Sequence, residues 1–476
     1  MSSRRSYGLL PTAYCLLVVG GVALAVRLAF GFRAPPFVTN DSLSYLLPGF
    51  DLARGFDFAP ILKRPPLYPL FVGGVIALFG EELRVLTLVQ HGLGVVTALC
   101  ACGIGRLVFG PPAGLLAGLT TALSGPLIVT EQYLMSETLF GAILTGAVLA
   151  FLLGIRGRHP HLGWFALTGL LLGLAALTRP VAQAVLILLL TSLPFLLPRR
   201  RPTLVAGAVL VGCFVLTILP WMARNLAVQG TFAVAGGLGE GLAVRTIRYD
   251  QQFDFRDPPG SEADRLLGRA RRIYRDEAAD GSAFALARRL RDELGVTELQ
   301  ADTLMRRIAL DALWARPAYY LQGTAEMFVR TLIGRPVRLR QDWTPWRNIV
   351  WEPRVDHLLP APTPAEERQF TTAEWLASLY DPARPPYPIV LPVLLAIGAL
   401  SGLTRRHRPA LMLAALVLGL LLAGAALIGI EWRYRYPLDP LINVIAAGGL
   451  VQLAAGILSA ARQTRPRARP RLREAA

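Results

Sequence analysis

Apolar residues along this chain gather into long, almost uncharged runs instead of alternating with polar residues. Each run is roughly 17–25 residues long, enough for a helix to cross the hydrocarbon core of a bilayer. Helices of soluble proteins are apolar on one side, whereas these runs are apolar all round. The pattern predicts an all-α polytopic membrane protein with about ten transmembrane helices, at 9–30, 85–108, 111–129, 138–155, 162–178, 181–197, 203–222, 387–403, 409–429 and 437–460.

A shorter apolar stretch at 67–80, LYPLFVGGVIALFG, decides the orientation of these helices. Its length is unusual for a span and typical of an interfacial helix. If it does not cross, every strong basic cluster in a short loop, such as Arg199-Arg200-Arg201, falls on the cytoplasmic side, as the positive-inside rule requires. If it crosses, the clusters after it move outside. We therefore interpret 67–80 as a juxtamembrane helix on the outer face.

This topology divides the chain into an N-terminal membrane module (1–222), an outer region (223–386), C-terminal membrane helices (387–460) and a basic cytoplasmic tail (461–476). The outer region is expected to hold charged helices at 262–278 and 283–294, an interfacial helix at 316–334 and an irregular stretch at 335–386. Four segments then share the outer surface: loop 31–84, turn 130–137, region 223–386 and turn 430–436.

The composition is 53% hydrophobic, and the formal net charge of +17 invites comparison with nucleic-acid-binding proteins. Most basic residues, however, lie in short segments between apolar runs or at the C-terminus. That distribution orients helices and contacts anionic headgroups, so it predicts membrane lipids as partners and no nucleic acid. The four cysteines all lie inside apolar runs, where they behave as small hydrophobic residues.

Charged residues gather where the spans meet the outer surface, and they are the candidates for chemistry. A charge set directly against an apolar span is costly without a partner. Each one also has a simpler explanation, because carboxylates cap helix starts and arginines reach toward headgroups. The residues concerned are Asp41, Lys63, Arg64, Glu137, Arg179, Arg224, Arg433 and Arg435, with Tyr45 and Tyr68 beside them.

These residue types suit a reaction on a sugar carried by a lipid phosphate. Arginine or lysine would hold the phosphate at the membrane surface, and a carboxylate would take the proton of an acceptor hydroxyl. One carboxylate is enough for a direct displacement with inversion, by analogy with inverting glycosidases. The alternative is a transporter or flippase of lipid-linked glycans, which would need polar or broken helices near the bilayer midplane. The third hypothesis is a scaffolding membrane protein without catalytic chemistry.

Several short motifs, in their order along the chain, resemble a known family. They are Asp41-x-x-x-Tyr45, Arg64-Pro65-Pro66, Glu137, Leu177-Thr178-Arg179-Pro180, Pro220-Trp221-Met222-Ala223-Arg224-Asn225 and Arg433-Tyr434-Arg435-Tyr436-Pro437. The arrangement resembles the GT-C glycosyltransferases, in particular the branch with protein O-mannosyltransferases and lipid A aminoarabinose transferases. The resemblance covers about 1–230 and 385–460.

The resemblance implies a GT-C-like fold and a polyprenyl-phosphate sugar donor. It makes Asp41 the catalytic base with Tyr45 in support, and Arg64 the phosphate ligand assisted by Lys63. Glu137 would contact the sugar, or a metal where one is present. Further phosphate or headgroup contacts and supporting roles fall to Arg224, Arg433, Arg435, Tyr68 and Arg179.

Two further expectations concern the metal and the location. Many relatives have Asp-Glu at the first site, whereas here Asp41 is followed by Ser42, so a divalent metal at Asp41 and Glu137 is left open and the sequence establishes no cofactor. Composition rich in Arg and Ala fits a high-GC bacterium, which indicates the inner (plasma) membrane with the active site facing outward. The acceptor, whether glycan, lipid or protein, is not identified.

Overall fold

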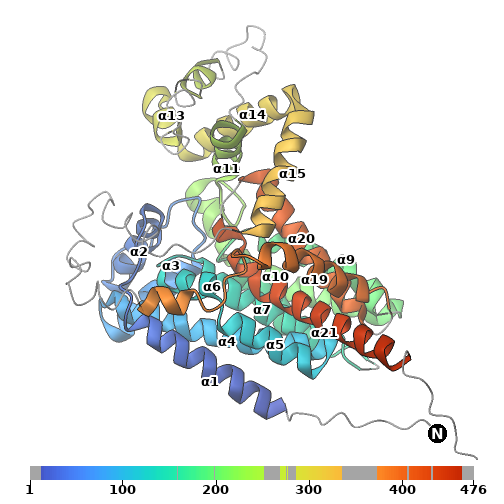
Figure 1. The fold of residues 1–476 in the computed structure, drawn as a ribbon. Coiled ribbons are helices and arrows are strands. Elements are labelled where there is room, and N and C mark those ends of the chain that lie inside the picture. Colours follow the sequence, from blue (N-terminus) through green and yellow to red (C-terminus); the bar gives the residue numbers. More distant parts are fainter. Residues whose placement is uncertain are drawn as a thin grey trace, which may run out of the picture.

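A computed structural model describes residues 12–157, 159–197, 199–250, 268–274, 276, 286–334, 372–404, 407–429 and 432–463 (Figure 1). In this part of the chain every regular element is a helix. Six helices are long and apolar enough to cross a membrane: α1 (Thr12–Gly31), α4 (Leu83–Phe109), α7 (Glu137–Gly154), α10 (Arg200–Gln229), α20 (Arg408–Leu427) and α21 (Asp439–Gln463). The predicted all-α membrane fold is confirmed, and the exact number of spans stays a prediction.

Helix α4 lies at the centre of the bundle, where it contacts α1, α5 (Pro111–Ala122), α7 and α21. Small residues permit this packing. A Cβ on Gly114 of α5 would lie 2.7 Å from the carbonyl oxygen of Cys102 and 2.8 Å from Cβ of Arg106, both on α4. Because lipid tails are as apolar as leucine, such close backbone approach is what holds membrane helices together.

The predicted single span at 111–129 is wrong in one respect, because α5 ends at Ala122 and a separate helix, α6 (Gly125–Gln132), begins after Ser124. A Cβ on Gly125 would collide with the carbonyl oxygen of Ala377, and Ser124 forms an isolated bridge with Tyr380. A segment from the C-terminal half of the chain therefore passes where a straight helix would continue.

Two short helices, α2 (Asn40–Ala53) and α3 (Leu67–Phe79), fill the first outer loop and pack against each other. A reciprocal capping box between Thr39 and Ser42 starts α2 and places Asp41 in its first turn. At 1.5 Å per residue the 13 residues of α3 span about 20 Å, which is too short for a typical hydrocarbon core. Its length agrees with the predicted juxtamembrane helix.

The shorter apolar helices α8 (Leu162–Ala176), α9 (Ala182–Leu196) and α19 (Tyr387–Ser401) complete the bundle. They pack on α7, α10, α20 and α21. Their positions match three of the predicted spans, whereas α10 continues to Gln229 and so exceeds the predicted 203–222.

The described residues between 238 and 334 form a lobe that stands beyond the bundle at the top of Figure 1. It contains α11 (Leu238–Val244), a π-helical turn at Arg245–Asp250, α13 (Leu286–Leu294), α14 (Glu298–Ala315) and α15 (Pro317–Ile333). The lobe has its own hydrophobic core, and α15 packs back along α20. Buried Arg245 pairs with Asp250 and donates to the carbonyl oxygen of Ala425 at the end of α20, which fastens the lobe to the bundle.

Some expectations for this region fall largely outside the described residues. Of the predicted helix 262–278, residues 268–274 are described and helical; of 335–386, residues 372–377 form a short helix. Between α20 and α21 the described residues are 428–429 and those from 432 on, and the latter form two 3-10 turns, Trp432–Tyr434 and Tyr436–Leu438. The second turn contacts the start of α7.

Candidate active site

Asp41 lies between two arginines that come from distant parts of the chain. Arg64 donates through Nη2 to Asp41 Oδ1 at 2.7 Å, and Arg433 donates through Nη1 to Asp41 Oδ2 at 2.6 Å. Burial alone would raise the pKa of the Asp41 carboxyl, but these guanidiniums outweigh it and hold that pKa well below its usual range. The Asp41 side chain remains 34% exposed, so the carboxylate is ionised and reachable.

The guanidinium of Arg64 is held in one orientation by α2. Its Nε donates to Ser44 Oγ at 2.8 Å and its Nη1 to the hydroxyl of Tyr45 at 3.0 Å, while its Cζ lies 4.5 Å from the Tyr45 ring centre. Tyr45 in turn packs edge-on against buried Tyr68, with ring centres 5.1 Å apart. A cation fixed this way loses little freedom when it binds an anion.

A second carboxylate, Glu137, lies at the first turn of α7 and is 2% exposed. Arg179 donates to Glu137 Oε1 at 2.6 Å and to Ser136 Oγ at 3.1 Å. Ser136 Oγ also lies 3.2 Å from the hydroxyl of Tyr45, so it joins the two halves of the site. Glu137 Oε2 is buried and has no hydrogen-bond partner among the described residues.

Arg433 bridges the two carboxylates, since its Nε lies 3.9 Å from Glu137 Oε1 while its Nη1 bonds Asp41. The ring of Tyr434 lies under both Arg179 and Arg433, at 5.2 Å and 5.6 Å from their guanidinium carbons. The cluster thus holds three guanidiniums and two carboxylates. Its excess of one positive charge favours binding of an anion.

Lys63 lies beside the cluster and contributes to the low pKa of Asp41. Its Nζ is engaged by Glu240 of α11, at 2.9 Å from Oε1. Backbone contacts reinforce the link, because the amide of Gly236 donates to the carbonyl oxygen of Leu62 at 3.0 Å. The loop that contains Arg64 is therefore bound to the start of the lobe at α11.

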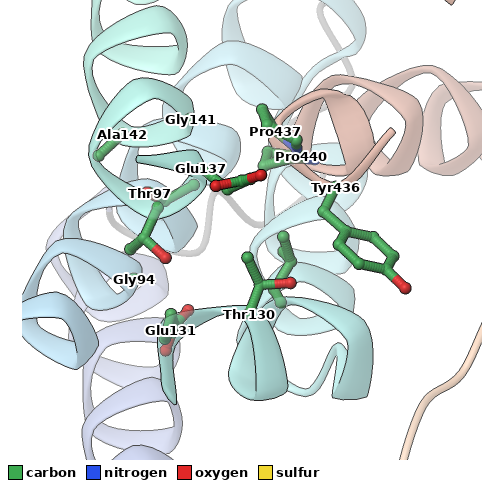
Figure 2. Close-up of a pocket in the computed structure, with 12 residues that line it drawn as sticks. Gly94, Thr97, Thr130, Glu131, Glu137, Gly141, Ala142, Tyr436, Pro437 and Pro440 are labelled. Carbon is green, nitrogen blue, oxygen red and sulfur yellow. The ribbon is translucent and has the colours of Figure 1, made fainter. Parts of the chain in front are cut away.

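A cavity of about 20 Å³ lies beside Glu137, and Asp41 is not among the residues that line it (Figure 2). Figure 2 shows Glu137 and Glu131 on separate helices around it, with Thr97 and Thr130 also on its wall. A space of that volume holds about one water molecule. It is far too small for a sugar.

Glu131 belongs to the packing of the bundle and not to this cluster. It is 3% exposed, accepts from Arg27 of α1 at 2.8 Å, and lies 2.7 Å from Nδ1 of His91 on α4. These are the partners that buried charges require in a membrane protein.

The structure brings together Asp41, Tyr45, Arg64, Glu137, Arg179 and Arg433 of the residues predicted from the sequence, with Lys63 adjacent. It places two others elsewhere and a third at the edge of the cluster. Arg435 is 2% exposed and donates to Asp439 at 2.9 Å, and Arg224 lies over Trp221 at 4.7 Å. Tyr68 packs on Tyr45 and interacts electrostatically with Glu137, while its hydroxyl donates to Gln90 at 2.7 Å.

Two serines of the cluster were not predicted. Ser44 lies one turn after Asp41 on α2, and Ser136 directly precedes Glu137. Their proximity in sequence to the two carboxylates is the signal that could have identified them.

A divalent metal does not fit the two carboxylates as they are arranged. Asp41 and Glu137 each hold a guanidinium at 2.6–2.7 Å, where a metal would have to displace it. In the described part of the chain no group of three or more His, Cys, Asp or Glu side chains gathers at one place.

Comparisons with known proteins agree with the predicted fold. Residues 63–223, less than half of the chain, match the model of the dolichyl-phosphate-mannose-protein mannosyltransferase family. The oligosaccharyltransferase AglB from Archaeoglobus fulgidus, solved with an inhibitory peptide and a dolichol-phosphate, is similar over 97% of this chain and 52% of its own, at 14% identity and a TM-score of 0.51. The Archaeoglobus fulgidus oligosaccharyltransferase tethered to an acceptor peptide is similar over 97% of this chain and 51% of its own, at 12% identity and a TM-score of 0.50.

ArnT from Cupriavidus metallidurans bound to undecaprenyl phosphate is similar over 96% of this chain and 81% of its own, at 12% identity and a TM-score of 0.40. No protein of curated function matches the sequence. The chain thus spans about half the length of the oligosaccharyltransferase that it resembles. The family match and the similarity to the oligosaccharyltransferase confirm the GT-C fold predicted from the sequence.

Proposed function

Because the chain has the GT-C fold of membrane glycosyltransferases, we propose that it transfers a sugar from a polyprenyl-phosphate donor to an acceptor hydroxyl at the outer membrane face. One observation carries the proposal: the Asp41 carboxylate is shared between Arg64 and Arg433 at the same end of the bundle as Glu137. The family match includes Arg64, Glu137 and Arg179, and AglB, which shares the fold, was solved with a dolichol-phosphate.

The donor phosphate binds Arg64 and Arg433 in this proposal. A sugar joined to a polyprenol through one phosphate carries one negative charge, which equals the positive excess of the cluster. Guanidiniums bind phosphate oxygens through paired N–H groups. As the sugar leaves, the phosphate gains a second negative charge, so the two arginines stabilise the departing group more strongly than the intact donor.

The transfer itself is a single displacement. The acceptor oxygen forms a bond to the anomeric carbon while its proton passes to Asp41. The bond from that carbon to the phosphate oxygen breaks, and its electron pair stays on the phosphate. Attack opposite the leaving group inverts the anomeric configuration, as in inverting glycosidases. Glu137, oriented by Arg179, contacts the sugar hydroxyls.

Donor binding also adjusts the strength of the base. In the free protein the two guanidiniums keep the pKa of Asp41 low, which makes the carboxylate ionised but weakly basic. A bound phosphate takes up part of the guanidinium charge, and the pKa of Asp41 rises toward its usual value. Asp41 therefore becomes an effective base only when a donor is present.

The positive-inside rule places this end of the bundle on the outer side, because Arg199, Arg200 and Arg201 lie at the opposite end, before α10. We propose a plasma-membrane location with the site facing outward.

The direct test is turnover of a panel of short-chain polyprenyl-phosphate sugars by the purified chain in nanodiscs. We expect release of polyprenyl phosphate from one sugar class, faster than from the matching diphosphate donors, with inverted anomeric configuration in the product by NMR. Retained configuration would contradict the single displacement. Absence of turnover and of binding for every donor, in folded protein, would contradict the proposed function.

A further inference from the structure

A second cavity, of about 560 Å³, lies at the other end of the bundle from Asp41 and Glu137. Its walls come from α1, α4, α5, α7 and the start of α20. Helix α7 begins at Glu137 and reaches this cavity through Leu153 near its end. Its 18 residues span about 27 Å, so the cavity lies at the level of the opposite leaflet.

The charge in this cavity has one sign. Arg106 of α4 and Arg156, just after α7, line it, and no carboxylate does so among the described residues. Nη1 of Arg106 is buried and has no hydrogen-bond partner in the described part of the chain. A buried guanidinium nitrogen without an acceptor is unfavourable, and no protein acceptor offsets its charge here; an anion bound at the part of the guanidinium that lines the cavity would do so.

The backbone holds Arg106 in place. Gly114 of α5 lies against the α4 backbone at Arg106, because a Cβ on Gly114 would lie 2.8 Å from both Cβ and the amide nitrogen of Arg106. Arg106 is thus carried by a closely packed helix pair and not by a surface loop.

The rest of the wall is apolar and includes Leu107, Leu149, Leu153 and Pro409. Two guanidiniums beside leucine side chains, at the depth of a leaflet boundary, match the chemistry of a phosphate headgroup with its acyl chains. We propose that this cavity binds an acidic phospholipid of the leaflet opposite the active site. The phosphate contacts Arg106 and Arg156, and an acyl chain follows the leucines of α4 and α7.

Charge argues against the neighbouring parts of the chain as the occupant. Residues 1–11 contain Arg4 and Arg5 and no acidic residue, and the residues just before Pro409 are Arg405, Arg406, His407 and Arg408. Such segments would add positive charge to a cavity that already has an excess of it.

The test measures lipid retention by the full chain, purified in nanodiscs of phosphatidylcholine with and without phosphatidylglycerol and released for native mass spectrometry. We expect R106Q/R156Q to lose retained phosphatidylglycerol, with affinity reduced about tenfold or more for each arginine removed. The matched control is R199Q/R200Q, which removes the same charge from exposed arginines at the same end of the bundle.

Equal loss in both double variants would reveal a general basic surface, and no loss in R106Q/R156Q would remove the site; either result overturns the proposal. Inorganic phosphate that protects the detergent-solubilised chain against heat as well as phosphatidylglycerol does would indicate a phosphate site without a lipid. If R106Q/R156Q does not fold, R156Q alone decides, because Arg156 is exposed. Sugar transfer is not measured here, so failure leaves the proposed function intact.

Discussion

Removing the charge of Glu137 tests whether the cluster is built as a network of paired charges. Glu137 is 2% exposed and Arg179 14%, and their nitrogen and oxygen atoms lie 2.6 Å apart. Breaking a buried ion pair by removing one partner lowers the free energy of unfolding by about 3–5 kcal/mol, because the other charge is left without compensation. Arg179 retains its contacts with Ser136 and the Tyr434 ring. We therefore expect E137Q to lower the free energy of unfolding by about 3 kcal/mol, the lower end of this range.

The double variant should recover most of that loss. E137Q/R179Q removes both charges and leaves mainly two lost hydrogen bonds, each about 0.5–1.5 kcal/mol. The double-mutant cycle should therefore give a coupling free energy of about 2–4 kcal/mol. The same cycle on Arg54 and Glu81, a pair about one-third exposed, should give less than about 1 kcal/mol.

The assay is reversible unfolding of each variant in mixed detergent, monitored by tryptophan fluorescence. The unfolding free energies of the four proteins in each cycle are compared near their midpoints. Additive losses at Glu137 and Arg179, or a coupling no larger than that of the control pair, would refute the buried network.

Three further outcomes follow from the same contacts. R64Q should reduce kcat/KM for the donor by about 10–150-fold, the worth of a charge-assisted hydrogen bond of 1.5–3 kcal/mol, whereas R54Q should leave it unchanged in the same steady-state assay. Since the pKa of Asp41 is held below its usual range, it stays ionised as pH falls through the usual range. The pH profile of kcat/KM should therefore show no acid limb from Asp41 between about pH 5 and 8. R433Q removes one of the two guanidiniums and should raise the pKa of Asp41. An acid limb of the wild type near pH 6 would contradict the assignment of Asp41 as the base. Dialysis against EDTA should not change the transfer rate, and activity restored only by Mn²⁺ or Mg²⁺ would show that a metal displaces the arginines.

Much of the helix layout was predictable because membrane spans have a strong local signal. The predicted 138–155 and 162–178 agree closely with α7 and α8. The break between α5 and α6 was not predicted, since it depends on contact of Gly125 with Ala377, far away in sequence. A local signal did exist in Ser124-Gly125-Pro126, three residues typical of a turn followed by a helix start.

The cluster of the candidate site was predictable in part. Placement of charged residues at the outer ends of spans identified Asp41, Arg64 and Glu137. The sequence could not decide between Arg433 and Arg435, because both belong to one short turn and have the same side chain. The structure directs Arg433 to Asp41 and buries Arg435 against Asp439, a difference set by the two 3-10 turns before α21.

The central claim is that Asp41 is the base of a sugar transfer from a lipid phosphate. Its most direct test is consumption of a polyprenyl-phosphate sugar by the wild type and by D41N, with R54Q as the control and folding checked by the unfolding midpoint. The account predicts that D41N keeps its fold and binds the donor but loses transfer by at least about 100-fold, the lower end of a general-base contribution. Transfer at the wild-type rate in folded D41N would contradict it.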